Sequence, residues 1–215
     1  MTNAISLTPR DDDILLTLSR RVRCLGIHQI ASHWWHDNVD AKRNSRARLK
    51  QLEAAGYLSQ GRVLASPLPI LKAPLIDWRP GESTPDFGRV SYYLKQRFTD
   101  PAVPTAIVFA LPSAANRCGG QPGRAPRRSE ATHDLGLSQV YLNLHRDNSL
   151  LAACWVSEAT LTSRSRKDAR KVPDALLRFK DGSETLVEFG GEYGKAKLLA
   201  FHEDCDDQGK AYQLW

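Results

Sequence analysis

The clearest folding signal in the chain is the stretch of residues 172–191, in which two short apolar runs flank Asp181-Gly182. An Asp-Gly pair between such runs predicts a tight turn, and therefore a β-hairpin. Each predicted strand carries one carboxylate, Asp174 on the first and Glu188 on the second. Because successive residues of a strand point to opposite faces, the register of the hairpin decides whether these two side chains meet.

A three-residue loop beginning at Asp181 pairs Leu176 with Glu188 and places both carboxylates on one face. An even loop pairs Ala175 with Glu188 instead and mixes Glu188 with apolar side chains. The odd loop sorts the residues more cleanly, and it makes Asp174 and Glu188 diagonal neighbours. The opposite face then gathers Ala175, Leu177, Phe179, Thr185, Val187 and Phe189. Two such carboxylates are typical ligands of Mg²⁺ or Mn²⁺ in phosphodiester chemistry, although exposed acids are also common on ordinary hairpins.

The composition is that of a soluble globular protein of one or two domains, with 41% hydrophobic and 25% charged residues in 215. The net charge of +6 favours a polyanionic partner, most often nucleic acid, although a modest charge also simply keeps proteins in solution. We expect a bacterial cytoplasmic protein without membrane insertion, because the sequence contains no leader and no apolar run of about 20 residues. Four scattered cysteines fit buried thiols in a reducing compartment.

Three helices followed by extended segments are predicted in the N-terminal part of the chain. Thr8 and Pro9 begin the first helix, residues 27–35 form the second, and residues 39–55 form the third. The segments 57–65 and 69–78 are expected to pair as a wing. The third helix concentrates basic and amide side chains that suit insertion into a DNA groove, or equally form a solvated face. These residues are Lys42, Arg43, Asn44, Arg46, Arg48 and Lys50.

A linker at residues 79–86, a bridging helix at 87–98 and a buried strand at 105–111 are predicted next. Residues 113–132 are rich in Gly, Pro and Arg, and we expect a mobile basic loop there. Arg127 and Arg128 are candidates for clamping DNA, but a loop without a role fits the same pattern. A second basic run, residues 164–171, directly precedes Asp174.

The remaining elements are a helix at 130–146, a strand at 152–158, the hairpin, a helix at 195–203 and a strand at 212–215. This order, with Pro173-Asp174 on one strand and Glu188 on the next, is similar to the PD-(D/E)XK nucleases. Over nearly the whole chain the sequence resembles the MOBC-type plasmid mobilisation relaxases and the related replication-relaxation proteins. The resemblance rests on Leu-Thr-Pro-Arg-Asp near the start, His133-Asp-Leu, Val172-Pro-Asp, Val187-Glu-Phe-Gly-Gly-Glu-Tyr and the closing Tyr-Gln-Leu-Trp.

The resemblance implies an α+β protein with an N-terminal winged helix (residues 1–80), a linker and bridging helix (81–100) and a restriction-endonuclease-like core (101–215). It also implies a metal-dependent endonuclease that nicks a plasmid origin of transfer together with relaxosome or coupling proteins, acting on duplex and single-stranded DNA. Asp174 and Glu188 would bind Mg²⁺ or Mn²⁺. The alternative is a non-catalytic winged-helix regulator or replication accessory protein.

One departure from the nuclease pattern concerns the motif lysine, whose position is occupied by Gly190. Lys195 and Lys197, at the start of the following helix, are the candidate substitutes. Glu158, at the end of the preceding strand, is a candidate third acid. Tyr193 is interpreted either as a phosphate-contacting phenol, as an alternative nucleophile, or as an aromatic at the rim of the site.

Overall fold

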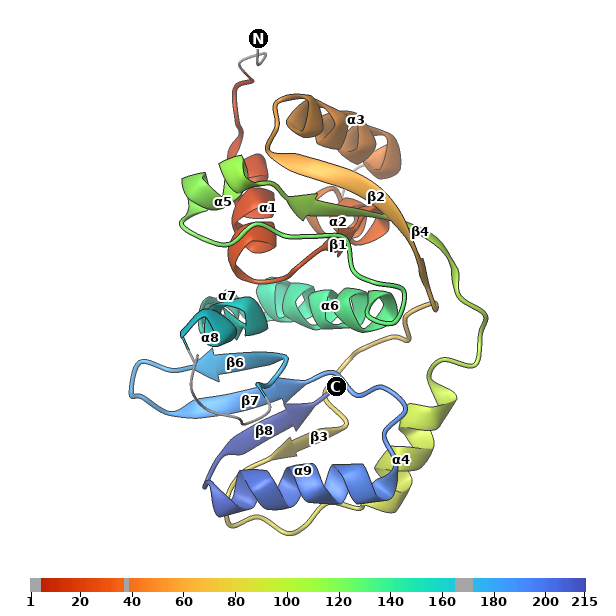
Figure 1. Cartoon of the computed structure of the whole chain (residues 1–215), viewed down its shortest axis with the longest axis vertical. Helices are drawn as coiled ribbons and strands as arrows, with labels where there is room; N and C mark the ends of the chain where they lie inside the picture. Colours follow the sequence, from red (N-terminus) through yellow and green to blue (C-terminus); the bar gives the residue numbers. More distant parts are fainter. Residues whose placement is uncertain (1–4, 37–38, 165–171) are drawn as a thin grey trace. The chain divides into compact units, whose positions relative to one another are not determined.

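The computed structural model describes residues 5–36, 39–164 and 172–215 (Figure 1). As predicted, the chain is a mixed α+β protein. It divides into two compact units, each assembled from two separate stretches of chain. The first unit comprises Met1–Ala65 and Ala102–Leu142, and the second comprises Ser66–Pro101 and Asn143–Trp215. The predicted boundary at residue 100 lies next to the division at Pro101–Ala102, whereas the one at residue 80 falls inside the second unit.

The first unit packs helices against a three-stranded antiparallel sheet. Its helices are α1 (Pro9–Arg20), α2 (Ile27–Trp34), α3 (Ala41–Ala54), α5 (Pro112–Cys118) and the first part of α6 (Ala131–Asp147). The sheet has the order β1 (Leu25–Gly26), β4 (Val103–Ala110), β2 (Leu58–Ala65). Thr8 caps α1 as predicted, because its hydroxyl accepts from the Asp11 N–H while the Asp11 carboxylate accepts from the Thr8 N–H.

The predicted wing is wrong in its second strand. β2 pairs along its whole length with β4, from Leu58 opposite Ala110 to Ala65 opposite Val103. Residues 69–78 instead supply β3 (Ile76–Trp78), which joins the sheet of the second unit. Burial of apolar side chains accounts for β2 pairing with β4 and not with β3. Ile107 and Val108 of β4 are fully buried in the first unit, whereas Trp78 of β3 is buried in the core of the second.

The second unit contains a five-stranded sheet of order β3-β8-β7-β6-β5. Its other strands are β5 (Trp155–Ser157), β6 (Ala175–Arg178), β7 (Glu184–Glu188) and β8 (Ala211–Leu214). All neighbours are antiparallel except β7 and β8, which are connected by helix α9 (Lys195–Asp207). Helix α4 (Phe87–Gln96) packs with α9, β3 and β8 around a core that includes Trp78, Leu94 and Tyr212. The short helices α7 (Ser149–Ala153) and α8 (Glu158–Arg164) flank β5.

The hairpin loop has the predicted odd length but starts one residue earlier than predicted. Phe179 N–H donates to the Ser183 carbonyl oxygen at 2.9 Å, so the loop consists of residues 180–182. The predicted Leu176–Glu188 pairing is therefore wrong, and Leu176 lies opposite Leu186. The cause is Gly182, whose φ of 87° suits the last position of a three-residue loop.

Candidate functional site

The two predicted metal ligands lie side by side at one end of the hairpin. Ala175 pairs with Val187, so continuing the register by one step places Asp174 opposite Glu188. Opposed residues of antiparallel strands point to the same face, and the two carboxylates are direct rather than diagonal neighbours. Glu188 is only 2% exposed. The Asp174 carboxylate accepts a 2.8 Å hydrogen bond from the Phe189 N–H, which fixes it against the end of β7.

Glu158 lies on the other side of Asp174. Its N–H donates to the Asp174 carbonyl oxygen at 3.3 Å, continuing the pairing of Ser157 with Ala175. The backbones of the three acidic residues are thus neighbours on three adjacent strand ends. Within residues 5–36, 39–164 and 172–215, no three or more His, Cys, Asp or Glu side chains converge as a metal site. Asp174 and Glu188, on one face of the hairpin, are therefore a candidate pair of ligands for a hard cation.

The Tyr193 phenol lies close to this carboxylate pair. Burial raises the pKa of Tyr193 above its ordinary value, and the charges of Glu188 and Asp174 raise it further. The Ser91 hydroxyl donates to the Tyr193 carbonyl oxygen at 3.0 Å and holds the loop against α4. A phenol in this setting stays protonated at neutral pH, so it can donate a hydrogen bond.

Of the two candidate lysines, the structure brings Lys197 to the site. Its ammonium lies 3.5 Å from the centroid of the Tyr193 ring, which is a close cation–π contact. Lys195 is the exposed first residue of α9. Lys197, in the first turn of the helix, therefore reaches the phenol that lies beside the carboxylates.

The position of the missing motif lysine is closed by packing. Gly190 is buried, and a Cβ added to it would lie 2.6 Å from Leu94 Cδ2 and 3.4 Å from Leu214 Cδ1. The Gly190 N–H also donates to the Trp215 carbonyl oxygen at 2.8 Å. No side chain fits there unless Leu94 moves, which gives the departure from the nuclease pattern a physical cause.

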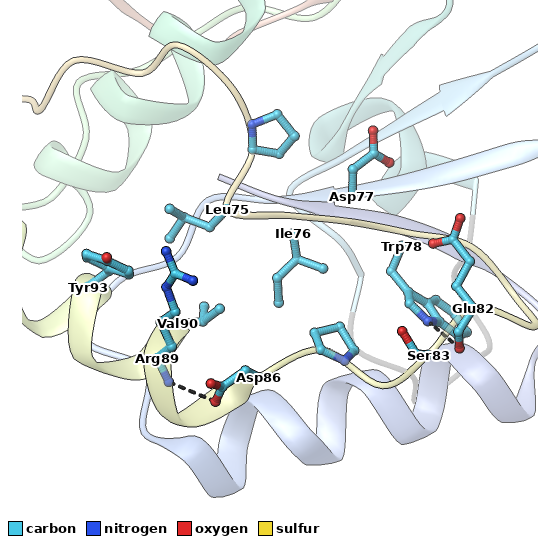
Figure 2. Close-up of a pocket in the computed structure, with 12 residues that line it drawn as sticks. Leu75, Ile76, Asp77, Trp78, Glu82, Ser83, Asp86, Arg89, Val90 and Tyr93 are labelled. Carbon is cyan, nitrogen blue, oxygen red and sulfur yellow. Dashed lines mark hydrogen bonds between the residues drawn. The ribbon is translucent and has the colours of Figure 1, made fainter.

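A groove of about 790 Å³ runs along β3 and the start of α4 (Figure 2). Its floor includes Ile76, Trp78 and Val90, and its rim carries Arg89 and Tyr93 together with carboxylates. These carboxylates belong to Asp77, Glu82 and Asp86. The groove contains none of the predicted catalytic residues, and it was missed because residues 79–86 have the composition of a plain linker.

The basic residues of α3 separate into two groups. Lys42, Arg46 and Lys50 are exposed at intervals of four residues, so they form one stripe along the helix. Arg43 is also exposed and pairs with Asp40 at 2.7 Å, and Asn44 is half-buried. Arg48 differs, because its guanidinium binds the fully buried Asp11 carboxylate at 2.6 Å and ties α3 to α1.

The stretch predicted as a mobile basic loop is instead partly helical and closely attached to the first unit. It begins with α5, and then Gln121 N–H donates to the Ser19 carbonyl oxygen. At Gly120 and Gly123 an added Cβ would lie 2.2 Å and 2.5 Å from backbone oxygens of Ser19 and Arg23, so the chain approaches too closely for any side chain.

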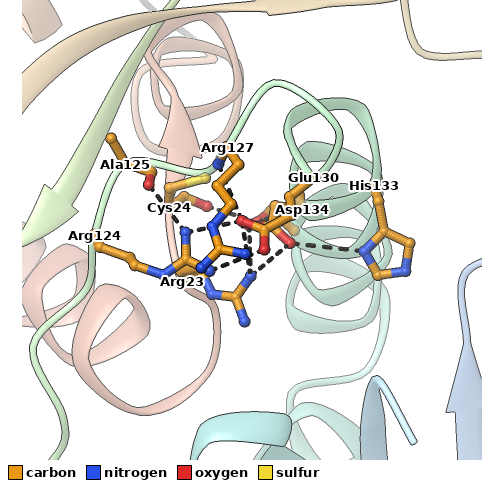
Figure 3. Close-up of polar contacts among 9 residues, drawn as sticks. Arg23, Cys24, Arg124, Ala125, Arg127, Glu130, His133 and Asp134 are labelled. Carbon is orange, nitrogen blue, oxygen red and sulfur yellow. Dashed lines mark hydrogen bonds and ion pairs between the residues drawn. The ribbon is translucent and has the colours of Figure 1, made fainter.

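An ion-pair cluster fixes the end of this stretch (Figure 3). Arg124 binds Glu130 at 2.8 Å, and Arg23 binds Asp134 at 3.0 Å. The pKa of Glu130 falls to about 2, chiefly because of the hydrogen bond from Arg124 and then that from the Arg127 N–H. The side chains of Arg127 and Arg128 remain exposed next to this cluster. The second basic run, 164–171, lies outside the described residues apart from the backbone of Arg164, where α8 ends.

Comparisons with protein-family models, with curated proteins and with solved structures gave no match. In the described part of the chain, no helix is both long and apolar enough to cross a membrane.

Proposed function

We propose that the protein is a metal-dependent DNA endonuclease of the relaxase type that nicks one strand at a plasmid origin of transfer. The observation that carries this proposal is the Asp174–Glu188 pair on one face of the hairpin, with Tyr193 and Lys197 beside it. Two carboxylates next to a lysine ammonium and a phenol match the requirements of phosphodiester cleavage better than those of a purely structural hairpin.

In the proposed site Asp174 and Glu188 would hold Mg²⁺ or Mn²⁺, which would supply Lewis-acid activation of the scissile phosphate and of an attacking water. Lys197 replaces the lysine that Gly190 excludes and stabilises negative charge developing on the phosphate. The Tyr193 phenol, which lies beside the two carboxylates, is assigned to contact a phosphate oxygen of the bound strand. Glu158 is the additional acid at the neighbouring strand end, and Lys195 contacts the backbone of the bound strand.

DNA recognition is assigned to the first unit. Its element order α1-β1-α2-α3-β2-β4 supports assignment as a winged helix, in which β2 and β4 would form the wing. The stripe of Lys42, Arg46 and Lys50 on α3 suits phosphate and base-edge contacts in the major groove of an origin duplex. Arg127 and Arg128 add further positive charge in the same unit. The core of the second unit, with its parallel β7–α9–β8 crossover, would be the restriction-endonuclease-like part.

The test is relaxation of a supercoiled plasmid carrying the origin of transfer, with Mg²⁺ or Mn²⁺. We expect open circles from the wild type, loss of the product with chelator, and no product from Asp174→Ala or Glu188→Ala. Glu184→Ala is the matched control, because Glu184 lies on the same strand but pairs with Arg178 at 2.9 Å near the turn. Full nicking by Asp174→Ala would rule out the assigned ligands.

A second candidate function is that of a non-catalytic DNA-binding regulator or replication accessory protein. It is favoured by one observation, the packing that closes position 190 to the motif lysine. This function predicts origin binding that is equal in the wild type, Asp174→Ala and Glu188→Ala, with no relaxation by any of them. Gel-shift measurement with the same three proteins tests the binding, and the absence of relaxation by the wild type separates this function from the endonuclease.

A further inference from the structure

Helix α4 exposes two adjacent aromatic side chains. Tyr92 is 64% exposed and Tyr93 is 47% exposed, and their ring centroids lie 6.1 Å apart with an edge-to-face geometry. The inner face of the same helix is buried through Phe87, Val90, Ser91 and Leu94. Both tyrosine rings therefore lie on the solvent side of the helix and present aromatic surface to a ligand, with Arg89 beside the Tyr93 ring.

Cationic side chains accompany the two rings. The Arg89 guanidinium lies 5.6 Å from the centroid of the Tyr93 ring, and Figure 2 shows the two side chains next to each other on α4. Lys95 is exposed near the end of the helix. From residue 87 to residue 98 the sequence has three basic residues and no Asp or Glu, and since Arg97 is half-buried over the Phe189 ring, the exposed cations of this helix are Arg89 and Lys95. The exposed face of α4 is thus aromatic and cationic.

Open aromatic rings beside Arg and Lys have the chemistry that binds unpaired bases and their phosphates. Bases in a duplex are already stacked on one another and cannot lie on a tyrosine ring, so the partner of such a face is single-stranded. We propose that Arg89, Tyr92, Tyr93 and Lys95 form a binding surface for single-stranded nucleic acid, here named the α4 surface. Bases stack on the two rings, and the two cations contact the phosphates.

The groove next to α4 limits where the strand can run. Its carboxylates, Asp77, Glu82 and Asp86, would repel phosphates, which keeps the strand on the outer face of the helix. The same carboxylates would suit a basic peptide, and that partner is the competing outcome of the test.

The α4 surface belongs to the helix that supports the carboxylate site. Ser91 donates to the Tyr193 carbonyl oxygen, and Leu94 packs against Gly190. A strand bound to α4 is therefore held by the second unit itself. This inference goes beyond the proposed nicking activity, because strand binding needs neither a metal nor cleavage.

The experiment is fluorescence anisotropy of a labelled oligothymidine of about a dozen nucleotides, titrated with the full chain in EDTA. For the double variant Tyr92→Ala/Tyr93→Ala we expect binding weaker by about tenfold or more, since each stacked base contributes strongly. The matched variant Tyr92→Phe/Tyr93→Phe keeps both rings and should bind like the wild type. Both positions are exposed, so the substitutions should leave the thermal unfolding midpoint unchanged.

A labelled duplex of the same length serves as the second probe. Lys42→Ala/Arg46→Ala on α3 should weaken duplex binding more than oligothymidine binding, and the tyrosine variant should do the reverse. Equal oligothymidine binding by the wild type and the double alanine variant, or none by the wild type, would overturn the inference. If the tyrosine substitutions weakened the binding of a labelled oligoarginine peptide but left oligothymidine binding unchanged, α4 would be assigned to a peptide instead. Asp174→Ala should bind oligothymidine as tightly as the wild type does. A failure to nick DNA would therefore not contradict the proposed strand binding.

Discussion

Asp11 shows how a single buried carboxylate positions the helix assigned to DNA recognition. It is fully buried, caps the start of α1 and binds Arg48 of α3. We expect Asp11→Asn to destabilise the protein by about 1.5–3 kcal/mol, since the buried carboxylate loses its charge-assisted hydrogen bonds with Arg48, whose side chain is 22% exposed. Urea denaturation measures this effect. Asp12→Asn is the control: its ion pair with Arg117 is half exposed, so the midpoint should move far less.

The same carboxylate predicts a pH dependence. Burial acts to raise the pKa of Asp11, but hydrogen bonds from Arg48 and Thr8 outweigh it and leave the pKa below its ordinary value. A lowered pKa in the folded state contributes stability above the ordinary value of about 4, and that contribution is lost as the pH falls through the folded value. The difference in unfolding free energy between wild type and Asp11→Asn should therefore shrink from pH 7 to pH 3. A constant difference would show that the charge is not responsible.

Gly190 is the residue at which local packing and proposed chemistry conflict. Gly190→Ala should destabilise the protein by about 1–3 kcal/mol, because the new methyl group overlaps Leu94. Gly191→Ala is the matched control, since its Cβ would meet only Tyr193 Cε1, at 3.8 Å. In a Leu94→Ala background, Gly190→Ala should lower the unfolding free energy by less than it does in the wild type. If the effects of the two substitutions were additive instead, the strain would not come from contact with Leu94.

At the scale of the element, the hairpin separates what a sequence pattern predicts from what it does not. Alternation of apolar and polar residues predicted the odd loop and the shared face of Asp174 and Glu188, because a one-residue slip would bury the wrong set. It did not predict the loop position, since a shift of one residue at each side keeps the same faces. The conformation of Gly182 decides that position.

The loop position can be tested through Gly182. We expect Gly182→Ala to cost about 1 kcal/mol, because an alanine is strained at a φ of 87°. Gly61→Ala on β2 is the control: its nearest contact would be Ile107 Cγ1 at 3.8 Å and its φ is not positive. Thermal unfolding of the two variants gives the comparison. Equal midpoints would mean that the loop relaxes without strain.

The geometry of the candidate site was predictable where its residues are close in sequence and less so where packing decides. Asp174, Glu188 and Tyr193 lie within 20 residues, and local strand geometry brings them together. Arg48 has the same sequence character as Arg46, yet only Arg48 pairs with Asp11, a partner 37 positions away. The closure of position 190 likewise depends on Leu94, which belongs to a distant helix. Such long-range contacts leave no periodic signal in a single sequence.

At the scale of the whole molecule, the order of the elements was better predicted than their partners. Neighbouring strands in sequence usually pair, so residues 69–78 were expected to complete the wing. Instead, residues Ser66–Pro101 form part of the second unit and interrupt the first between β2 and β4. Composition indicates a linker near residue 80, but it does not show that the chain later returns to the first unit.

This interruption makes a prediction about which part of the chain folds alone. Ala65 and Val103 are opposed across β2 and β4, so their Cα atoms are about 5 Å apart and a short Asn-Gly turn can join them. A chain of residues 1–65, that turn and 102–147 should unfold cooperatively by circular dichroism. Residues 1–100 alone should not, because β1 and β2 lose β4, the strand to which both are hydrogen-bonded. If residues 1–100 unfolded cooperatively and the joined chain did not, the first unit would not be assembled from the two stretches on either side of residues 66–101.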